Sequence, residues 1–142
     1  MEYLPSTDLA AIRQAITEAE KKTSAEIRVV IEEKCKGEVL DRAAFAFRKL
    51  KMHKTAQRNG VLVYVSVKDH QCAVIGDSGI NSLVEKDYWK TLLEEMIVFF
   101  SAGQLKEGII HAVNRVTSEL SSHFPLRKGD INELPDEVIT RL

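Results

Sequence analysis

The stretch at residues 52–80, which reads MHKTAQRNGVLVYVSVKDHQCAVIGDSGI, decides the fold that the chain can adopt. Residues 61–67 in its middle are rich in β-branched side chains and apolar on both faces, which predicts a central strand covered from both sides. Residues 68–70 supply a tight turn, and residues 71–75 are expected to pair back as an antiparallel strand. The stretch therefore predicts a β-hairpin inside a sheet.

Two polar loops flank this hairpin. Residues 58–60 (Arg-Asn-Gly) precede its first strand, and residues 76–79 (Gly-Asp-Ser-Gly) follow its second strand. Because the two strands are antiparallel neighbours, both loops should lie at the same edge of the sheet. Polar groups gathered in this way indicate a small site.

The sequence on either side of the hairpin predicts helices and one more strand. Residues 7–22 place apolar side chains at helical spacing after a Ser-Thr-Asp start, and residues 39–51, 85–101 and 104–123 also have helical spacing. Residues 25–31 alternate with a period of two instead, which is typical of a strand. The predicted order is helix, strand, helix, strand, strand, helix, helix.

This order predicts the fold class. Strands 25–31 and 61–67 are joined through a helix, so they should be parallel, with a right-handed crossover. The helices then cover both faces of a small mixed sheet. We expect an α/β fold, a three-layer α/β/α sandwich, in a single domain over residues 1–142. Its core spans about residues 7–124, and residues 125–142 form a weakly patterned tail that packs loosely.

Composition excludes several classes of protein. The 142 residues carry a formal net charge of −1, with 44% hydrophobic and 29% charged residues, which gives no sign of a nucleic-acid-binding surface. Cys35 and Cys72 form no CxxC motif and are too few for a disulfide framework. No apolar run is long enough for a membrane span, and the N-terminus has no signal-peptide pattern. We expect a cytoplasmic monomer, unless a signal peptide has been removed.

The predicted topology makes polar residues converge at one edge of the sheet. The amino ends of the two parallel strands and the carboxyl end of the third strand share this edge. The residues expected there are Ser24, Glu26, Arg58, Asn59, Gly60, Asp77 and Ser78. Their carboxylate, amide, hydroxyl and carbonyl groups form an all-oxygen set, which hard cations such as Ca²⁺ and Mg²⁺ prefer. Arg58 beside them can bind a phosphate oxygen through its fork of N–H groups.

The same residues are also typical of ordinary turns. Asn, Asp and Gly tolerate positive φ, so residues 59–60 and 76–79 can be turn chemistry alone. Asp77 can act only as the cap of a short turn, and Glu26 and Arg28 can form a structural pair across a pleat. Spacing alone leaves both the metal site and the structural interpretation open.

The opposite edge carries a second polar group: Glu32, Glu33, Cys35, Asp69 and His70. Ligands commonly bind beyond the carboxyl ends of parallel strands, which favours this edge, but the group has no glycine loop and no evident anion receptor. A pairing of Cys35 with His70 is one hypothesis for nucleophilic catalysis. Exposed turn charges and an unreactive thiol are the alternative.

Three segments resemble a known family: residues 23–29 (TSAEIRV), residues 58–64 (RNGVLVY) and residues 73–80 (AVIGDSGI). Residues 87–89 (DYW) fit as well. In this order and spacing the segments are similar to the TPM domain, also labelled a TPM-type phosphatase domain, in its small stand-alone bacterial form. The resemblance covers about residues 9–124.

This resemblance implies an α/β/α sandwich with a divalent-metal site at a sheet edge, often described with calcium. It also implies varied activities, because some members are reported to hydrolyse phosphate esters or nucleotides and others act in photosystem repair or as accessory subunits. By position, Glu26, Asn59, Gly60 and Asp77 match the polar edge of the family, with Arg58 and Ser24 as further members. Residues 2–8 are shorter than the acidic-aromatic element that many members carry before the first helix. If that element supplies a ligand, this chain has one carboxylate fewer.

Two functions follow as hypotheses. The first is a metal-dependent phosphohydrolase acting on nucleotides or phosphate esters, with Ca²⁺ (or Mg²⁺ or Mn²⁺) as cofactor and Asp77 and Arg58 as the catalytic residues. The second is a non-catalytic module, in which the ion stabilises the folded edge and a partner protein binds to it. In both, the predicted metal ligands are Asp77, Glu26, Asn59, Gly60 and Ser24.

Overall fold

The computed structural model describes residues 4–126 and 138–142, and within them the helices and strands follow the predicted order. The main elements are α1 (Ser6–Glu20), β1 (Glu26–Glu32), α2 (Val39–Lys49), β2 (Gly60–Ser66), β3 (Gln71–Gly76), α4 (Tyr88–Ser101) and α5 (Leu105–Leu120). Three short elements that the sequence did not predict join them: η1 (Met52–Lys54), α3 (Ser78–Asn81) and β4 (Val138–Ile139). None of the helices in this described part is long and apolar enough to cross a membrane.

The sheet is mixed, as predicted. Its strand order is β3-β2-β1-β4. β1 runs parallel to β2, with Glu26 opposite Gly60 and Glu32 opposite Ser66, and β3 runs antiparallel to β2. The chain passes from β1 to β2 through α2, because parallel neighbours need a long crossover connection. The α/β fold class is therefore confirmed.

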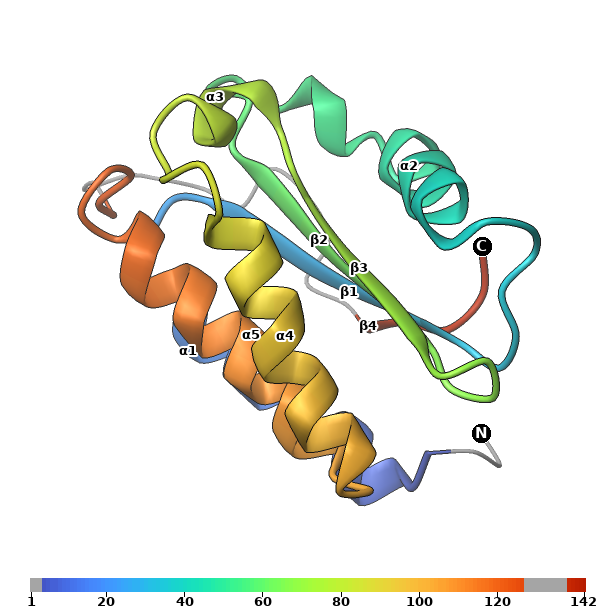
Figure 1. Ribbon diagram of the computed structural model, residues 1–142. Helices are drawn as coiled ribbons and strands as arrows, with labels where there is room; N and C mark the ends of the chain where they lie inside the picture. Colours follow the sequence, from blue (N-terminus) through green and yellow to red (C-terminus); the bar gives the residue numbers. More distant parts are fainter. Residues whose placement is uncertain (1–3, 127–137) are drawn as a thin grey trace.

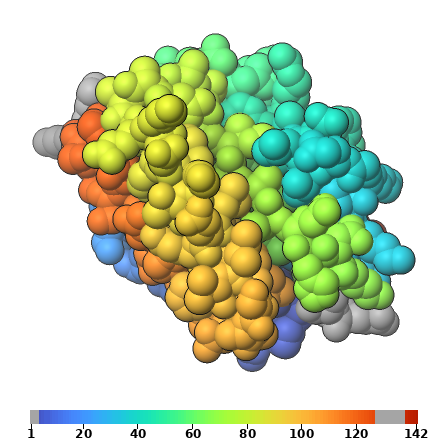
Figure 2. All heavy atoms as spheres, in the orientation of Figure 1, coloured from blue at the N-terminus to red at the C-terminus, as the bar shows by residue number. Residues whose placement is uncertain are grey.

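Helices cover both faces of the sheet (Figure 1). α2 packs on one face, over a core that includes Val30 and Leu62, while α1, α4 and α5 pack on the other face, over a core that includes Val29 and Val63. Successive strand residues enter opposite cores, which explains why β2 is buried at every position. Figure 2 shows the side of the molecule where α2 and α4 border the edge strand β3.

Of the expected loosely packed tail at residues 125–142, residues 127–137 lie outside the described residues. In the described part, Val138–Ile139 forms β4, which pairs in parallel with Val29 and Val30 of β1. Val138 is buried in the same core as the apolar residues of α1 and α5. A strand of two residues is too short to leave a periodic pattern in the sequence, so its tertiary contacts determine it.

Candidate functional site

The predicted convergence of polar residues is present where β1 and β2 begin. The Glu26 N–H donates to the Asn59 carbonyl at 3.2 Å, and the Asp77 N–H donates to the Gly60 carbonyl at 2.9 Å. Asn59 Nδ2 donates to the Ser24 carbonyl at 3.4 Å. These bonds tie the start of β1, the start of β2 and the end of β3 together. We name this region the amino edge, and it comprises residues 24–26, 58–60 and 76–79.

Close packing requires the two glycines of the Gly-Asp-Ser-Gly motif. A Cβ atom on Gly79 would overlap the Gln57 carbonyl oxygen, and a Cβ atom on Gly76 would overlap the Trp89 ring. The Gly79 N–H donates to the Arg58 carbonyl at 2.9 Å, so α3 sits directly on the loop that carries Arg58. Part of the motif is therefore structural, because it holds the two loops against each other.

Asp77 is paired with Arg58 in a two-pronged salt bridge. Arg58 Nε donates to Oδ2 and Nη2 donates to Oδ1, both at 2.9 Å. Oδ1 also accepts the Ser78 N–H at 2.7 Å, so Asp77 caps α3. This is the capping role that the alternative interpretation of the sequence predicts. Burial acts to raise the pKa of Asp77, but the hydrogen bonds from Arg58 and Ser78 outweigh burial and hold this pKa below its usual range. Asp77 is 6% exposed and Arg58 is 52% exposed.

Asn59 has a buried side-chain oxygen, Oδ1, that has no hydrogen-bond partner among the described residues. The residue is 1% exposed. Its backbone N–H donates to Thr55 Oγ1 at 3.1 Å, which fixes the loop before β2. A buried acceptor without a partner destabilises the fold by about 1–3 kcal/mol, so this atom requires an explanation. A bound cation or an ordered water molecule would satisfy it.

Glu26 and Ser24, two further predicted ligands, have structural contacts. Glu26 and Arg28 are 4% and 2% exposed, and Arg28 Nη2 donates to Glu26 Oε2 at 3.3 Å. This is the structural pair that the sequence offered as an alternative. The Ser24 hydroxyl donates to the Phe124 carbonyl at 3.4 Å, which links the start of β1 to the segment after α5.

These contacts decide how a cation fits the amino edge. Both Asp77 oxygens accept hydrogen bonds from Arg58, and Glu26 is already paired. In residues 4–126 and 138–142, no group of three or more His, Cys, Asp and Glu side chains is placed to hold a metal ion. The unpaired Asn59 Oδ1 suits a cation. Asp77 would be available as a second ligand only if the half-exposed Arg58 side chain turned into solvent.

A hollow of about 190 Å³ lies beside Asp77, on the α2 side of the sheet. Its polar lining comes from Arg48, His53, Arg58 and Asp77, and its apolar lining includes Phe47 and Ile75. No pattern in the sequence assigns Arg48 or His53 to a site. They reach the hollow because α2 ends at Lys49 and because Lys51, with a φ of 59°, leads directly into η1. The chain reverses direction between α2 and η1, and no local sequence motif predicts this reversal.

The opposite edge, where β1 and β2 end, carries the second predicted polar group (Glu32, Glu33, Cys35, Asp69 and His70), and we name it the carboxyl edge. Its carboxylates are engaged in structural contacts. Glu32 accepts two hydrogen bonds from Arg42 at 2.8 Å and one from the Tyr64 hydroxyl at 2.6 Å. The hydrogen bonds from Arg42 lower the pKa of Glu32, although burial opposes them. Asp69 accepts the Cys35 N–H at 2.6 Å. Both carboxylates therefore hold the local fold.

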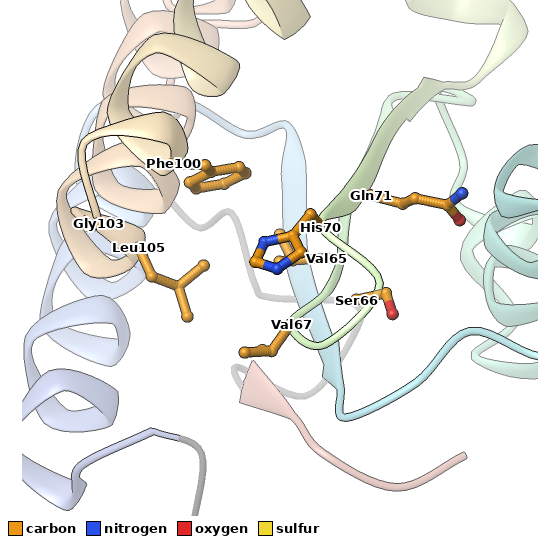
Figure 3. Close-up of a pocket in the computed structure, with 8 residues that line it drawn as sticks. All are labelled: Val65, Ser66, Val67, His70, Gln71, Phe100, Gly103 and Leu105. Carbon is orange, nitrogen blue, oxygen red and sulfur yellow. The ribbon is translucent and has the colours of Figure 1, made fainter.

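Cys35 and His70 do not form the pair that nucleophilic catalysis would need. Cys35 packs against the core on the α2 side, and its thiol donates to the Gly37 carbonyl at 3.5 Å. His70 lines a hollow of about 160 Å³ between the β2–β3 turn and the junction of α4 and α5. In Figure 3 its ring faces Phe100 and Leu105. The two side chains thus face opposite layers, and no hydrogen bond joins them in the described structure.

The architecture places the chain in the class of small α/β sandwiches, with polar residues at the amino edge of the sheet. The chain is 39% identical to BA42 protein from the psychrophilic bacterium Bizionia argentinensis, whose NMR structure matches with a TM-score of 0.89 over 97% of this chain and 95% of that chain. The N-terminal domain of a protein from P. gingivalis is 15% identical, with a TM-score of 0.71 over 85% of this chain and 78% of that chain. The N-terminal domain of cg2496 protein from Corynebacterium glutamicum is also 15% identical, with a TM-score of 0.65 over 84% of this chain and 75% of that chain. At 15% identity these last two structures show the fold alone.

The family is shown by a second comparison. The family model described as "TPM domain" matches residues 1–119. The chain therefore belongs to the TPM domain family, as its three sequence segments predicted. A comparison with the curated proteins finds no match.

Proposed function

We propose that the chain is a divalent-cation-binding TPM domain, with Ca²⁺ as the expected ion and Mg²⁺ or Mn²⁺ as the other candidates. The observation that carries the proposal is the buried Asn59 Oδ1, which has no partner among the described residues. Asn59 directly precedes Gly60, whose carbonyl accepts the Asp77 N–H, so the amide and the carboxylate belong to one edge. Amide and carboxylate oxygens are ligands that these hard cations prefer.

Arg58 has a specific part in this proposal, because its guanidinium neutralises Asp77 when no ion is bound. Its side chain is 52% exposed, whereas Asp77 is 6% exposed. A half-exposed guanidinium can turn into solvent, and a cation that takes its place at Asp77 would restore the countercharge that the buried carboxylate needs. Because the edge offers few carboxylates, water completes the coordination, and we expect an affinity on the order of 10⁻⁴ M or weaker.

Thermal unfolding tests the cation proposal. We expect Ca²⁺, Mg²⁺ or Mn²⁺ to raise the melting temperature of chelator-treated protein, because the ion binds the folded state. Asp77→Asn removes the charge of the carboxylate and should abolish the shift. The matched control is Asp87→Asn, because Asp87 is exposed at the start of α4 and makes no capping hydrogen bond. A shift that survives in Asp77→Asn would place the ion elsewhere. No shift with any of the three ions would overturn the proposal.

A second candidate function is hydrolysis of phosphate esters or nucleotides. The phosphatase label of the family favours it, and so does the position of Arg58. A bound divalent cation would offset phosphoryl charge and lower the pKa of a coordinated water. Arg58, once released from Asp77, can bind a phosphoryl oxygen with its planar fork. Asp77 and Arg58 are thus the two catalytic residues of this candidate, while Glu26 stays in its structural pair.

Phosphate release separates the two candidates. Chelator-treated protein is assayed with nucleotides and an aryl phosphate, and each metal is added back in turn. Metal-dependent release that is lost in Asp77→Asn supports the hydrolase. A melting shift without release supports the non-catalytic module, in which a protein partner binds the cation-ordered edge. Equal release from wild type and Asp77→Asn would remove this edge from the chemistry.

A further inference from the structure

We infer that the hollow beside Asp77 binds a small organic monoanion, a carboxylate attached to an aliphatic or aromatic group. The side chains that carry this inference belong to α2, η1 and β3. The site needs no metal, so the inference goes beyond the cation proposal and does not rest on it.

The hollow has a surplus of positive charge. Arg58 and Asp77 neutralise each other through two hydrogen bonds of 2.9 Å. Arg48, in the last turn of α2, is exposed, and its side chain makes no hydrogen bond or ion pair with any residue of the described part of the chain. If His53 is left out of the count, the guanidinium groups of Arg48 and Arg58 and the carboxylate of Asp77 sum to one net positive charge at the hollow. A singly charged ligand would balance this charge, and a guanidinium fork matches the two oxygens of a carboxylate.

The rest of the lining is apolar and small. Ala44, Phe47 and Arg48 lie three and four residues apart on one face of α2, and Ile75 of β3 adds to the apolar wall. A ligand would therefore place its charged end at Arg48 and its apolar body against Phe47 and Ile75. The volume of about 190 Å³ is below the roughly 300–1,000 Å³ of pockets for drug-sized ligands, so the body is no larger than a ring or a branched alkyl group.

His53 adds a polar group that has no partner in the described residues. Its Nδ1 is buried without a hydrogen bond, and its ring makes no other hydrogen bond to those residues. No hydrogen bond to the described residues therefore fixes the ring in the wall of the hollow. A neutral or protonated imidazole can donate an N–H to a carboxylate, so this residue is a second contact for the anion.

Titration with three related probes tests the inference in chelator-treated protein. Phenylacetate carries the proposed carboxylate, 2-phenylethanol has a similar body without charge, and phenyl phosphate carries a second charge. Binding is followed by NMR shifts of the backbone amides. We expect phenylacetate to bind about tenfold more tightly than 2-phenylethanol, because a charge-assisted hydrogen bond is gained. The largest shifts should fall at Arg48, His53 and Ile75.

Arginine variants show whether the charge of the hollow is responsible. Arg48→Gln should weaken phenylacetate binding about tenfold, and Arg48→Lys should be intermediate, because it keeps the charge and loses the fork. The matched control is Arg13→Gln, which removes the same charge from an exposed position on α1, in the opposite layer. This control should change binding by less than about twofold.

Three outcomes would overturn the inference: equal binding of phenylacetate and 2-phenylethanol, equal binding by Arg48→Gln and Arg13→Gln, or tighter binding of phenyl phosphate than of phenylacetate. The last outcome would assign the hollow to a phosphate ester instead. Because the chelator removes divalent ions, a failed melting shift with metals leaves these results unaffected. Absence of phenylacetate binding would also overturn the inference, but it would leave the cation proposal intact.

Discussion

At the carboxyl edge of the sheet Glu32 accepts two hydrogen bonds from Arg42 at 2.8 Å, and at the amino edge Asp77 accepts two from Arg58 at 2.9 Å. The bonding geometry of the two pairs is nearly the same, but their exposure differs. Glu32 and Arg42 are both 13% exposed, whereas Asp77 is 6% exposed and Arg58 is 52% exposed. The first pair is enclosed on both sides, and the second is open on the side of the arginine. Bonding geometry alone therefore does not distinguish a purely structural pair from a pair in which a ligand could replace the arginine.

The residues next to the two salt bridges differ in the same way, since one edge has its hydrogen bonds satisfied and the other does not. Tyr64 donates a third hydrogen bond to Glu32 at 2.6 Å, and both burial and this bond raise the pKa of Tyr64, so its hydroxyl stays a donor at neutral pH. At the amino edge, Asn59 Oδ1 is buried with no partner among the described residues. At the carboxyl edge, Glu32 thus has its hydrogen-bond partners within the protein. At the amino edge, Asn59 Oδ1 remains available to accept a bond from a ligand.

The largest effect should come from removing Arg42. Arg42→Met keeps the length of the side chain and deletes every donor, which leaves the mostly buried Glu32 charge with Tyr64 alone. We expect the free energy of unfolding at neutral pH to fall by about 2 kcal/mol, measured by urea denaturation. Arg58→Met is the matched variant at the pair that is open on the arginine side, and it should lose less. A loss in Arg58→Met equal to that in Arg42→Met would show that exposure does not distinguish the two pairs.

The next effect is a dependence of stability on pH. The pKa of Glu32 is lowered in the folded protein from an ordinary value of 4.5, mainly by the hydrogen bonds from Arg42. Its stabilising contribution is therefore fully present above pH 4.5 and is lost as the pH falls through the folded pKa. Wild type should lose more stability than Glu32→Gln below pH 4.5. Parallel stability curves for the two proteins in acid would contradict this assignment.

Tyr64→Phe should have a smaller effect, because it removes one of the three hydrogen bonds to Glu32. We expect a loss of about 1.5 kcal/mol in the free energy of unfolding, since the acceptor is charged. Tyr88→Phe is the comparison, because the Tyr88 hydroxyl donates to the neutral Arg115 carbonyl at 3.1 Å. Thermal unfolding of both variants measures the difference. A larger loss in Tyr88→Phe would mean that the charge of Glu32 adds nothing to the hydrogen bond.

Much of the fold was predictable because local pattern and tertiary structure agree. The apolar run at residues 61–67 and the alternation at residues 25–31 correspond to β2 and β1, within one residue at each end. The same topology correctly brought Glu26, Asn59 and Asp77 to one edge. β4 was missed because two residues carry no period, and α3 was missed because one helical turn looks like a loop.

The details of the site were less predictable, because they depend on side-chain pairing. The sequence assigned both Asp77 and Arg58 to a site, but it did not show that they bind each other. It also did not show that the loop after α2 returns Arg48 and His53 to the hollow beside them. Spacing places residues at an edge, and only packing decides which charges neutralise one another and which remain available to a ligand.

The smallest effect on stability, and the one that most sharpens the comparison, belongs to Arg58→Met. Without a cation this variant should lose less stability than Arg42→Met, because the guanidinium that it removes is already half exposed, although the Asp77 carboxylate is 6% exposed. Asp77 then has no counter-ion, so its affinity for Ca²⁺ should increase and the melting shift at a given Ca²⁺ concentration should grow. Lys68→Met is the matched control, because it removes a cation from an exposed pair with Glu33 and should alter neither quantity. If Ca²⁺ binding weakens in Arg58→Met, then Arg58 supports the ion instead of competing with it, and the difference between the two edges lies in Asn59 alone.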